Sequence, residues 1–157
     1  ISAVQTEYSL LYRTEAEETR QTTRQLGIGF VAYSPLGRGF LTGAIKEIAD
    51  VDGRRAAHPR FQAENFAHNR ELVAKIEAVA REKSCTPAQV TLAWLLAQGD
   101  DVVAIPGTRY EKRLDENLGG LRVSLSPDEV ARMSAAVPAG AASGERYPAA
   151  AMKAVYM

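Results

Sequence analysis

Two short runs of consecutive apolar residues place the strongest limits on the fold of this chain. They lie at residues 29–34 (GFVAYS) and 102–106 (VVAIP), and a helical pattern follows each of them. Strands that are apolar on both faces are typical of parallel sheets covered by helices. With a third predicted strand over residues 3–8, these runs predict an α/β fold with a parallel sheet.

Helix signals alternate with the predicted strands. We expect Thr14 to cap a helix that ends at residue 25, and a stripe of apolar residues predicts another helix over residues 69–83. Three capping-box patterns, each a Thr or Ser followed three residues later by Gln or Glu, predict helix starts at Thr86, Thr108 and Ser126. Residues 137–157 are rich in alanine, glycine and proline and are expected to form an irregular tail.

Charge and cysteine content exclude several classes of protein. Nineteen basic residues balance nineteen acidic ones, so bulk charge does not favour a nucleic-acid partner. The single cysteine, Cys85, cannot form an intrachain disulfide, and His58 and His68 lack the spacing of a metal-binding pair. The apolar runs are too short to cross a membrane, and no leader pattern opens the chain. We therefore expect a cytoplasmic protein with no metal site and no membrane or nucleic-acid partner.

The segment at residues 33–39 (YSPLGRG) follows the second predicted strand. Ligands of α/β proteins bind at the carboxyl ends of parallel strands, because the following loops converge there. A tyrosine there can offer its ring to a flat heterocycle, glycines let the backbone approach a phosphate, and Arg38 can neutralise it. The same pattern also fits a simple turn punctuated by proline and glycine.

A second candidate ligand site follows the third predicted strand, at residues 105–109 (IPGTR). The first N–H groups and the positive dipole end of the next helix form an anion site, which Thr108 and Arg109 would complete. Arg113, Glu116 and Asn117 share one face of that helix and could hold an adenine ring and a nearby phosphate. The alternative is a capped helix with a solvated polar face.

Two weaker candidates lie elsewhere in the chain. Gln5, on the first predicted strand, could bind an amide in a ligand cleft or could fill the interior of a barrel. The basic segment 54–61 (RRAAHPRF) could close over phosphates as a lid, although we favour a charged surface loop.

Taken together, these segments resemble the second half of an aldo-keto reductase, in family order and over nearly the whole chain. The segments that carry the resemblance are VQTEYSLL, GFVAYSPLGRGFLTG, PRFQAENF, TPAQVTLAWLLAQ, VVAIPGTRYEKRLDENLGG and SGERYP. The sequences of these segments resemble the bacterial and plant auxin-induced-protein branch more than the mammalian aldose reductases. The family is a (β/α)8 TIM barrel that binds NADPH and reduces aldehydes and ketones. The resemblance implies that residues 1–157 are the C-terminal half of this barrel, strands 6–8 and their helices, with the N-terminal half absent.

The resemblance also implies a role for each candidate site residue. Gln5 would contact the nicotinamide carboxamide, and Tyr33 would stack on the nicotinamide ring. The pyrophosphate would lie against Ser34, Pro35, Leu36, Gly37 and Arg38, with Arg54 on the covering loop. The 2′-phosphate would bind Thr108, Arg109 and Arg113, and the adenine would bind Glu116 and Asn117. Gly107 stands where many relatives carry a lysine, so the contact to the 2′-phosphate is rearranged or weakened.

No catalytic residue of the family is expected in this chain. The catalytic tetrad of Asp, Tyr, Lys and His lies on the first four strands of the barrel, and Tyr33 is not its tyrosine. We therefore expect the isolated chain to be inactive. Two alternatives to a fragment of an NADPH-dependent reductase stay open. One is a reductase-like nucleotide-binding or regulatory subunit without turnover, and the other is a self-associating half-barrel, whose six strands fall short of eight.

Overall fold

Three parallel strands form one sheet in the computed structural model, which describes residues 1–155 except for the side chain of Arg54. The strands are β1 (Ala3–Glu7), β2 (Gly29–Tyr33) and β3 (Val102–Ile105), in the order β1-β2-β3. Glu7 pairs with Tyr33 and Tyr33 with Ile105, so the three carboxyl ends are level. The predicted positions and parallel order of the strands are confirmed.

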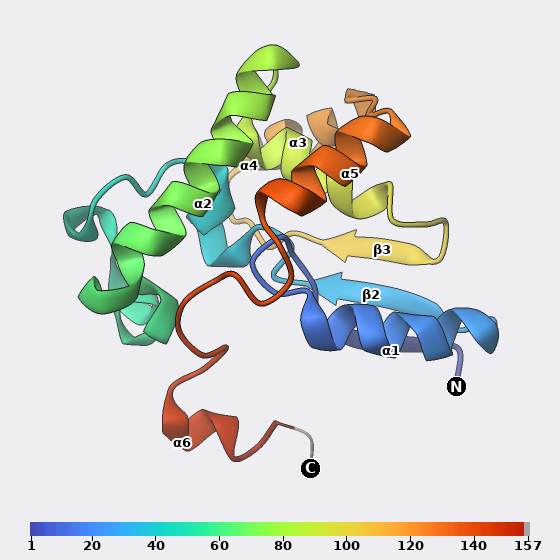
Figure 1. The fold of residues 1–157 in the computed structure, drawn as a ribbon, viewed down its shortest axis with the longest axis horizontal. Helices are drawn as coiled ribbons and strands as arrows, with labels where there is room; N and C mark the ends of the chain where they lie inside the picture. The colour runs from blue at the N-terminus through green and yellow to red at the C-terminus, as the bar shows by residue number, and fades with distance from the viewer. Residues whose placement is uncertain (156–157) are drawn as a thin grey trace.

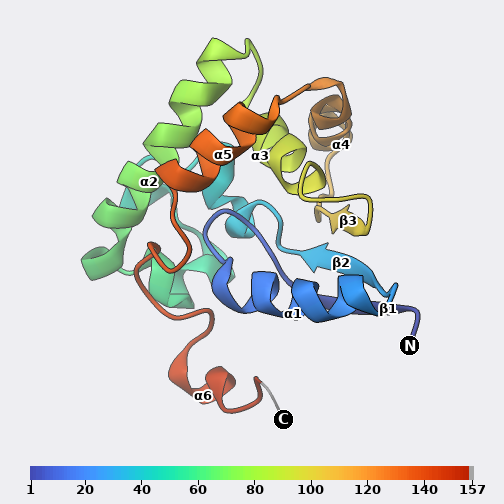
Figure 2. The ribbon, with the colours of Figure 1, turned by 45° about the vertical axis from the view of Figure 1, so that its right-hand side comes forward.

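Helices follow each strand, as Figure 1 shows. They are α1 (Thr14–Gln25), α2 (Ala63–Glu82), α3 (Pro87–Leu96), α4 (Glu111–Gly119), α5 (Pro127–Ala136) and the short α6 (Ala149–Met152). Short 3₁₀ turns occupy much of the loop between β2 and α2. After α5 the chain runs past the carboxyl ends of the strands to α6, and the turned view of Figure 2 shows the same path.

Two of the three predicted capping boxes are present. Thr86 Oγ1 accepts from Gln89 N at 3.2 Å, and Gln89 Oε1 accepts from Thr86 N at 3.0 Å. Ser126 and Glu129 form the same reciprocal pair at the start of α5. In both helices a proline follows the cap, where its missing N–H costs no hydrogen bond.

Two predicted caps are wrong. Thr14 is the first residue of α1 rather than its cap. Arg13 occupies the cap position without a side-chain cap, and its Nε donates to Glu17 at 2.7 Å. Thr108 Oγ1 accepts from Tyr110 N at 3.2 Å in a local turn, so α4 begins after Tyr110 without a side-chain cap. A hydroxyl that bonds its own near backbone competes with helix capping.

Helix α2 begins at Ala63, six residues before the predicted start at residue 69. Its buried stripe begins at Phe66, whose ring lies 5.3 Å from that of Phe40. Phe40 also contacts the ring of Phe61, at 5.0 Å. This aromatic cluster stabilises an extra N-terminal portion of α2 that the apolar spacing from residue 72 onward did not reveal.

One face of the sheet is buried, whereas the other is largely open except at the carboxyl end of β1, where Glu7 is fully buried. Phe30, Ala32 and Val102 belong to the buried core, whereas Val103 is 55% exposed and Ile105 is 43% exposed. The prediction of strands covered on both faces is therefore wrong for β3, and the second face of β2 is only half-buried. Gln5 is also exposed and, by its pairing with Val31 and the alternation of the strands, lies on the open face.

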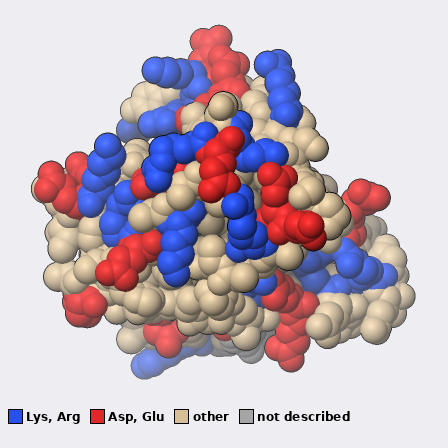
Figure 3. Space-filling view, turned by 45° about the horizontal axis from the view of Figure 1, so that its top comes forward, with Lys and Arg blue, Asp and Glu red and all other residues tan. Residues whose placement is uncertain are grey.

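Charged side chains of both signs lie intermixed on the face drawn in Figure 3, which agrees with the balanced composition. None of the helices within residues 1–155 combines the length and the apolar character that a membrane crossing requires.

Candidate functional site

A cavity of about 950 Å³ opens at the carboxyl ends of β2 and β3. It is lined by the turn after β2, by part of the loop that follows, and by the segment from β3 into α4. Most of the residues predicted from the sequence meet in it: Tyr33, Ser34, Pro35, Leu36, Arg38, Gly107, Thr108, Arg109, Arg113, Glu116 and Asn117. The two separate candidate sites of the sequence are thus two walls of one cavity.

Two predicted site residues, Gln5 and Gly37, are not part of this lining. Gln5 lies on the open face of the sheet, and Gly37 is buried under the turn, where an added Cβ would meet the Leu11 side chain at 3.2 Å. The side chain of Arg54 lies outside the described part of the structure.

The turn after β2 has an unusual backbone. Ser34 and Arg38 have φ values of 49° and 57°, a left-handed conformation that costs energy for residues other than glycine. The next residue, Gly39, has a φ of 96°, and an added Cβ there would lie 3.5 Å from the Arg55 guanidinium. Arg55 Nε also donates to Arg38 O at 2.8 Å. Arg55, in the loop between β2 and α2, therefore stabilises this strained turn, which forms one wall of the cavity.

The opposite wall carries two arginines at the start of α4. The Arg109 guanidinium lies 5.1 Å from the centre of the Tyr110 ring, and Arg113 Nη1 donates to Glu116 Oε2 at 2.6 Å. Arg113 and Arg109 are exposed, and they flank the positive end of the helix dipole. Positive charge at a helix N-terminus favours an anionic ligand.

Several lining residues were not assigned from the sequence, among them Arg55 and His58. Both belong to the basic segment 54–61, which in the structure contributes to the lining of the cavity. Burial and the nearby Arg38 charge lower the pKa of His58, so its ring is uncharged at neutral pH. The local excess of basic residues was the signal that could have found them.

Beside the cavity, three arginines converge on one buried carboxylate, Glu7. Glu7 is fully buried, and Arg38 donates to both of its oxygens, at 2.9 and 2.8 Å. Arg60 Nη1 and Arg146 Nε add contacts at 3.4 and 3.2 Å. We call these four residues the Glu7 cluster. The Arg38 guanidinium, expected at a phosphate, is held by Glu7 in this structure.

The Tyr33 hydroxyl is held by the C-terminal tail. Its Oη lies 2.7 Å from Tyr147 Oη, and Arg146 Nη2 donates to it. Burial, together with the hydrogen bond to Tyr147, raises the pKa of Tyr33 to about 12. The ring is therefore neutral at physiological pH, as a stacking surface requires, and it is a poor proton donor.

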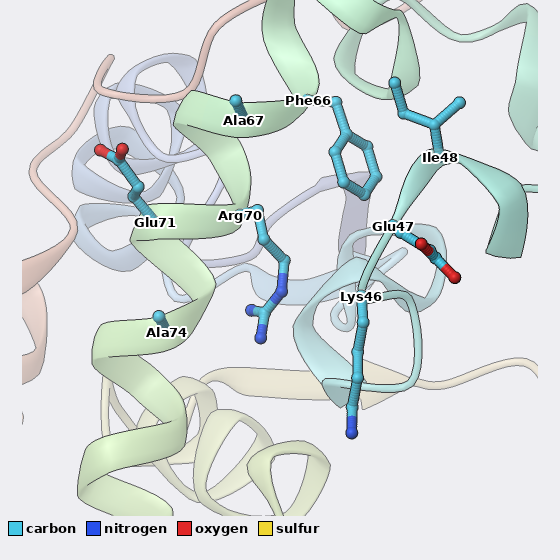
Figure 4. Close-up of a pocket in the computed structure, with 8 residues that line it drawn as sticks. All are labelled: Lys46, Glu47, Ile48, Phe66, Ala67, Arg70, Glu71 and Ala74. Atoms are coloured by element: carbon cyan, nitrogen blue, oxygen red, sulfur yellow. The ribbon is translucent and has the colours of Figure 1, made fainter.

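A second hollow, of about 550 Å³, lies between Lys46–Ile48 and α2 (Figure 4). Phe66 and Ile48 line it, and Arg70, which also faces it, is paired with Glu77 at 2.7 Å. None of the residues predicted as a ligand site lies there, so the larger cavity is the candidate functional site.

The family is decided by a comparison with known proteins. The model of the Aldo/keto reductase family matches residues 1–138. This chain belongs to that family. The resemblance drawn from the sequence segments is thereby confirmed.

Individual relatives agree with the family assignment. "Probable aldo-keto reductase 1" of Glycine max is 49% identical over 94% of this chain and 43% of its own length. "Aldo-keto reductase yakc [NADP(+)]" of Schizosaccharomyces pombe is 47% identical over the whole chain and 48% of its own length. The chain thus spans less than half the length of these two curated relatives.

A solved structure gives the same result for the fold. A thermostable aldo-keto reductase in complex with the inhibitor epalrestat superposes with a TM-score of 0.63 and 26% identity, over 87% of this chain and 40% of its own. Aldo-keto reductases have the (β/α)8 barrel fold, and the three parallel strands with their helices cover part of it.

Proposed function

We propose that this chain is the cofactor-binding half of an NADPH-dependent oxidoreductase that reduces aldehydes or ketones to alcohols. In this proposal β1, β2 and β3 are the sixth, seventh and eighth strands of the barrel. The observation that carries it is the cavity at their carboxyl ends, where a tyrosine, a left-handed turn and an arginine-bearing helix face meet. The relative whose name includes NADP(+) supports the choice of cofactor.

The lining of the cavity fits an extended dinucleotide. Arg109 and Arg113, with the positive end of α4, suit the 2′-phosphate, and Glu116 and Asn117 suit the adenine. An added Cβ at Gly107 would meet nothing within 4 Å, so this position leaves room rather than supplying a charge. The turn after β2 would lie along the pyrophosphate, and Tyr33 would face the nicotinamide.

When bound, NADPH would supply the hydride that reduces the carbonyl carbon. The role of this chain is to hold and orient the cofactor, because positioning of the reacting groups lowers the barrier. We assign no catalytic role to a described residue, and the high pKa of Tyr33 agrees with a stacking role.

Apolar surface beside β3 supports a further proposal, that the N-terminal half of the barrel is the partner of this chain. On α4 and just after it, Leu114 is 49%, Leu118 52% and Leu121 69% exposed. These leucines come after β3 in the chain, and β3 itself has Val103 and Ile105 exposed on the open face of the sheet. The first strands of a closed barrel would cover this surface and bring the catalytic groups to the cavity. We also propose that the protein acts in the reducing cytoplasm and that its substrate is a small carbonyl compound.

We predict that the isolated 157-residue chain has no carbonyl reductase activity. The expected result is no NADPH oxidation above background with aldehyde and ketone substrates, measured by absorbance on protein of verified intact mass. Robust turnover would place the catalytic groups within this chain and overturn the proposal. Nucleotide binding without turnover by the complete protein would instead favour a regulatory subunit.

We predict that Arg113→Ala in the complete protein weakens NADPH binding about tenfold to a hundredfold, because a charge-assisted contact to the 2′-phosphate is lost. NADH lacks this phosphate, so its affinity should change less than about threefold. Titration calorimetry with both cofactors measures the difference. Arg132→Ala is the matched control, since that arginine pairs with Glu82 at the surface. Equal losses for both cofactors would show that Arg113 does not bind the 2′-phosphate.

A further inference from the structure

The segment at residues 141–147, which we call the tail segment, is anchored to α2 by hydrogen bonds. His68 Nε2 lies 2.7 Å from Ala141 O. Asn69 Nδ2 donates to Ser143 O at 2.8 Å, and Ser143 N donates back to Asn69 Oδ1 at 2.8 Å. The reciprocal pair fixes the register of the tail segment just before it reaches the cavity.

A close backbone contact follows at Gly144. Its φ is +89°, and an added Cβ would lie 2.8 Å from Pro59 C and 2.9 Å from Arg60 N. Real Cβ atoms do not approach backbone atoms so closely, so a side chain at this position would push the tail segment off the loop. Glycine thus allows the chain to lie directly on the loop that carries Arg60 and His58.

The next residues reach the cofactor side of the cavity. Arg146 is only 7% exposed, and it donates both to Glu7 Oε2 and to Tyr33 Oη. Its guanidinium lies 5.3 Å from the centre of the Tyr33 ring. Tyr147 adds the hydroxyl contact to Tyr33, and its own ring lies 5.0 Å from the Arg38 guanidinium. Charge-assisted and cation–π contacts from one segment therefore fix both the hydroxyl and the face of Tyr33.

These contacts come from a part of the chain that the family model does not match, because that match ends at residue 138. They also converge on one end of the cavity. The tail segment contacts β1, β2, α2 and residues 38–60. Arg109 and Arg113 belong to a different part of the lining, the segment after β3, which these contacts do not reach.

We propose that the tail segment is a positioning element of the cofactor site, in which Arg146 holds the Tyr33 ring in place and Glu7 holds Arg146. This inference rests on the proposed function, in which Tyr33 faces the nicotinamide. Since coupling between two binding events is reciprocal, a docked tail segment strengthens NADPH binding, and bound NADPH strengthens the docking of the tail segment.

The test compares two ligands on the full-length protein that carries this chain. NADPH occupies the whole cavity, whereas adenosine 2′,5′-bisphosphate occupies only the end near Arg113. Arg146→Met removes the contacts to Glu7 and Tyr33, and Arg146→Lys keeps the charge without the forked geometry. Arg132→Met is the control, because that arginine pairs with Glu82 at the surface and makes no part of the Glu7 cluster or the tail segment. Affinities come from calorimetry, and docking is followed by hydrogen exchange of the amides of residues 143–147.

We expect Arg146→Met to weaken NADPH about tenfold and to leave the bisphosphate within about twofold. Arg146→Lys should be intermediate, and Arg132→Met should change neither affinity more than about twofold. Addition of NADPH should slow exchange of the tail amides in the wild-type protein.

Three other outcomes would contradict the inference, and they can be told apart. Unchanged NADPH affinity in Arg146→Met overturns the positioning role and leaves the proposed function intact. An equal loss for both ligands shows general damage to the fold rather than positioning of Tyr33. Failure of the wild-type protein to bind either ligand overturns the proposed function itself, and the inference with it.

Discussion

Replacing Glu7 by glutamine should lower the free energy of unfolding by about 3–5 kcal/mol. The carboxylate is fully buried and accepts hydrogen bonds from Arg38, Arg60 and Arg146, whose side chains are 15%, 9% and 8% exposed. Glutamine keeps the shape of the side chain but removes the one negative charge among these three guanidinium groups. Positive charges left uncompensated in a buried site are strongly destabilising. Urea unfolding, followed by fluorescence, measures the loss.

A matched control separates this effect from that of an ordinary surface ion pair. Glu82 pairs with Arg132 at 2.5 Å, and both side chains are about half exposed, at 53% and 51%. Solvent screens such a pair, so Glu82→Gln should cost less than about 1 kcal/mol. Equal losses at the two positions would show that burial of the Glu7 cluster has no special effect on stability.

The elements that the sequence predicts well are those set by neighbouring residues. Two of the three strands, β2 and β3, follow from short apolar runs, and the caps at Thr86 and Ser126 follow from residues three positions apart. Thr108 has the same local pattern but fails as a cap. Its hydroxyl bonds to Tyr110 N, a choice of partner that the pattern does not encode.

The two walls of the candidate site could also be predicted, because each follows the end of a parallel strand. The Glu7 cluster could not. Its arginines lie 31, 53 and 139 residues from Glu7 along the chain, and only the folded structure brings them together. The sequence alone therefore predicts that Arg38 is free to bind a phosphate, whereas in the structure it is already paired with Glu7.

Trp94→Ala should also lower the free energy of unfolding by about 3–5 kcal/mol, because it opens a large cavity in the core. Trp94 is fully buried, as its place in an apolar helix predicts, and its ring lies 5.7 Å from that of Tyr8. Its Nε1 donates to Ser134 Oγ at 2.9 Å. The side chain thus joins α3 to the end of β1 and to α5. Circular dichroism in urea measures the change without relying on the tryptophan signal.

Two further variants decide how Trp94 stabilises the fold. Trp94→Phe keeps a six-membered ring in the core and loses the pyrrole part of the indole with its hydrogen bond to Ser134, which still donates to Val130 O at 2.9 Å. Its loss should therefore be less than half that of the alanine variant. Leu26→Ala, at a side chain that is 67% exposed, should change stability by less than about 0.5 kcal/mol. If Trp94→Phe were as damaging as Trp94→Ala, the indole hydrogen bond rather than core packing would hold these three elements together.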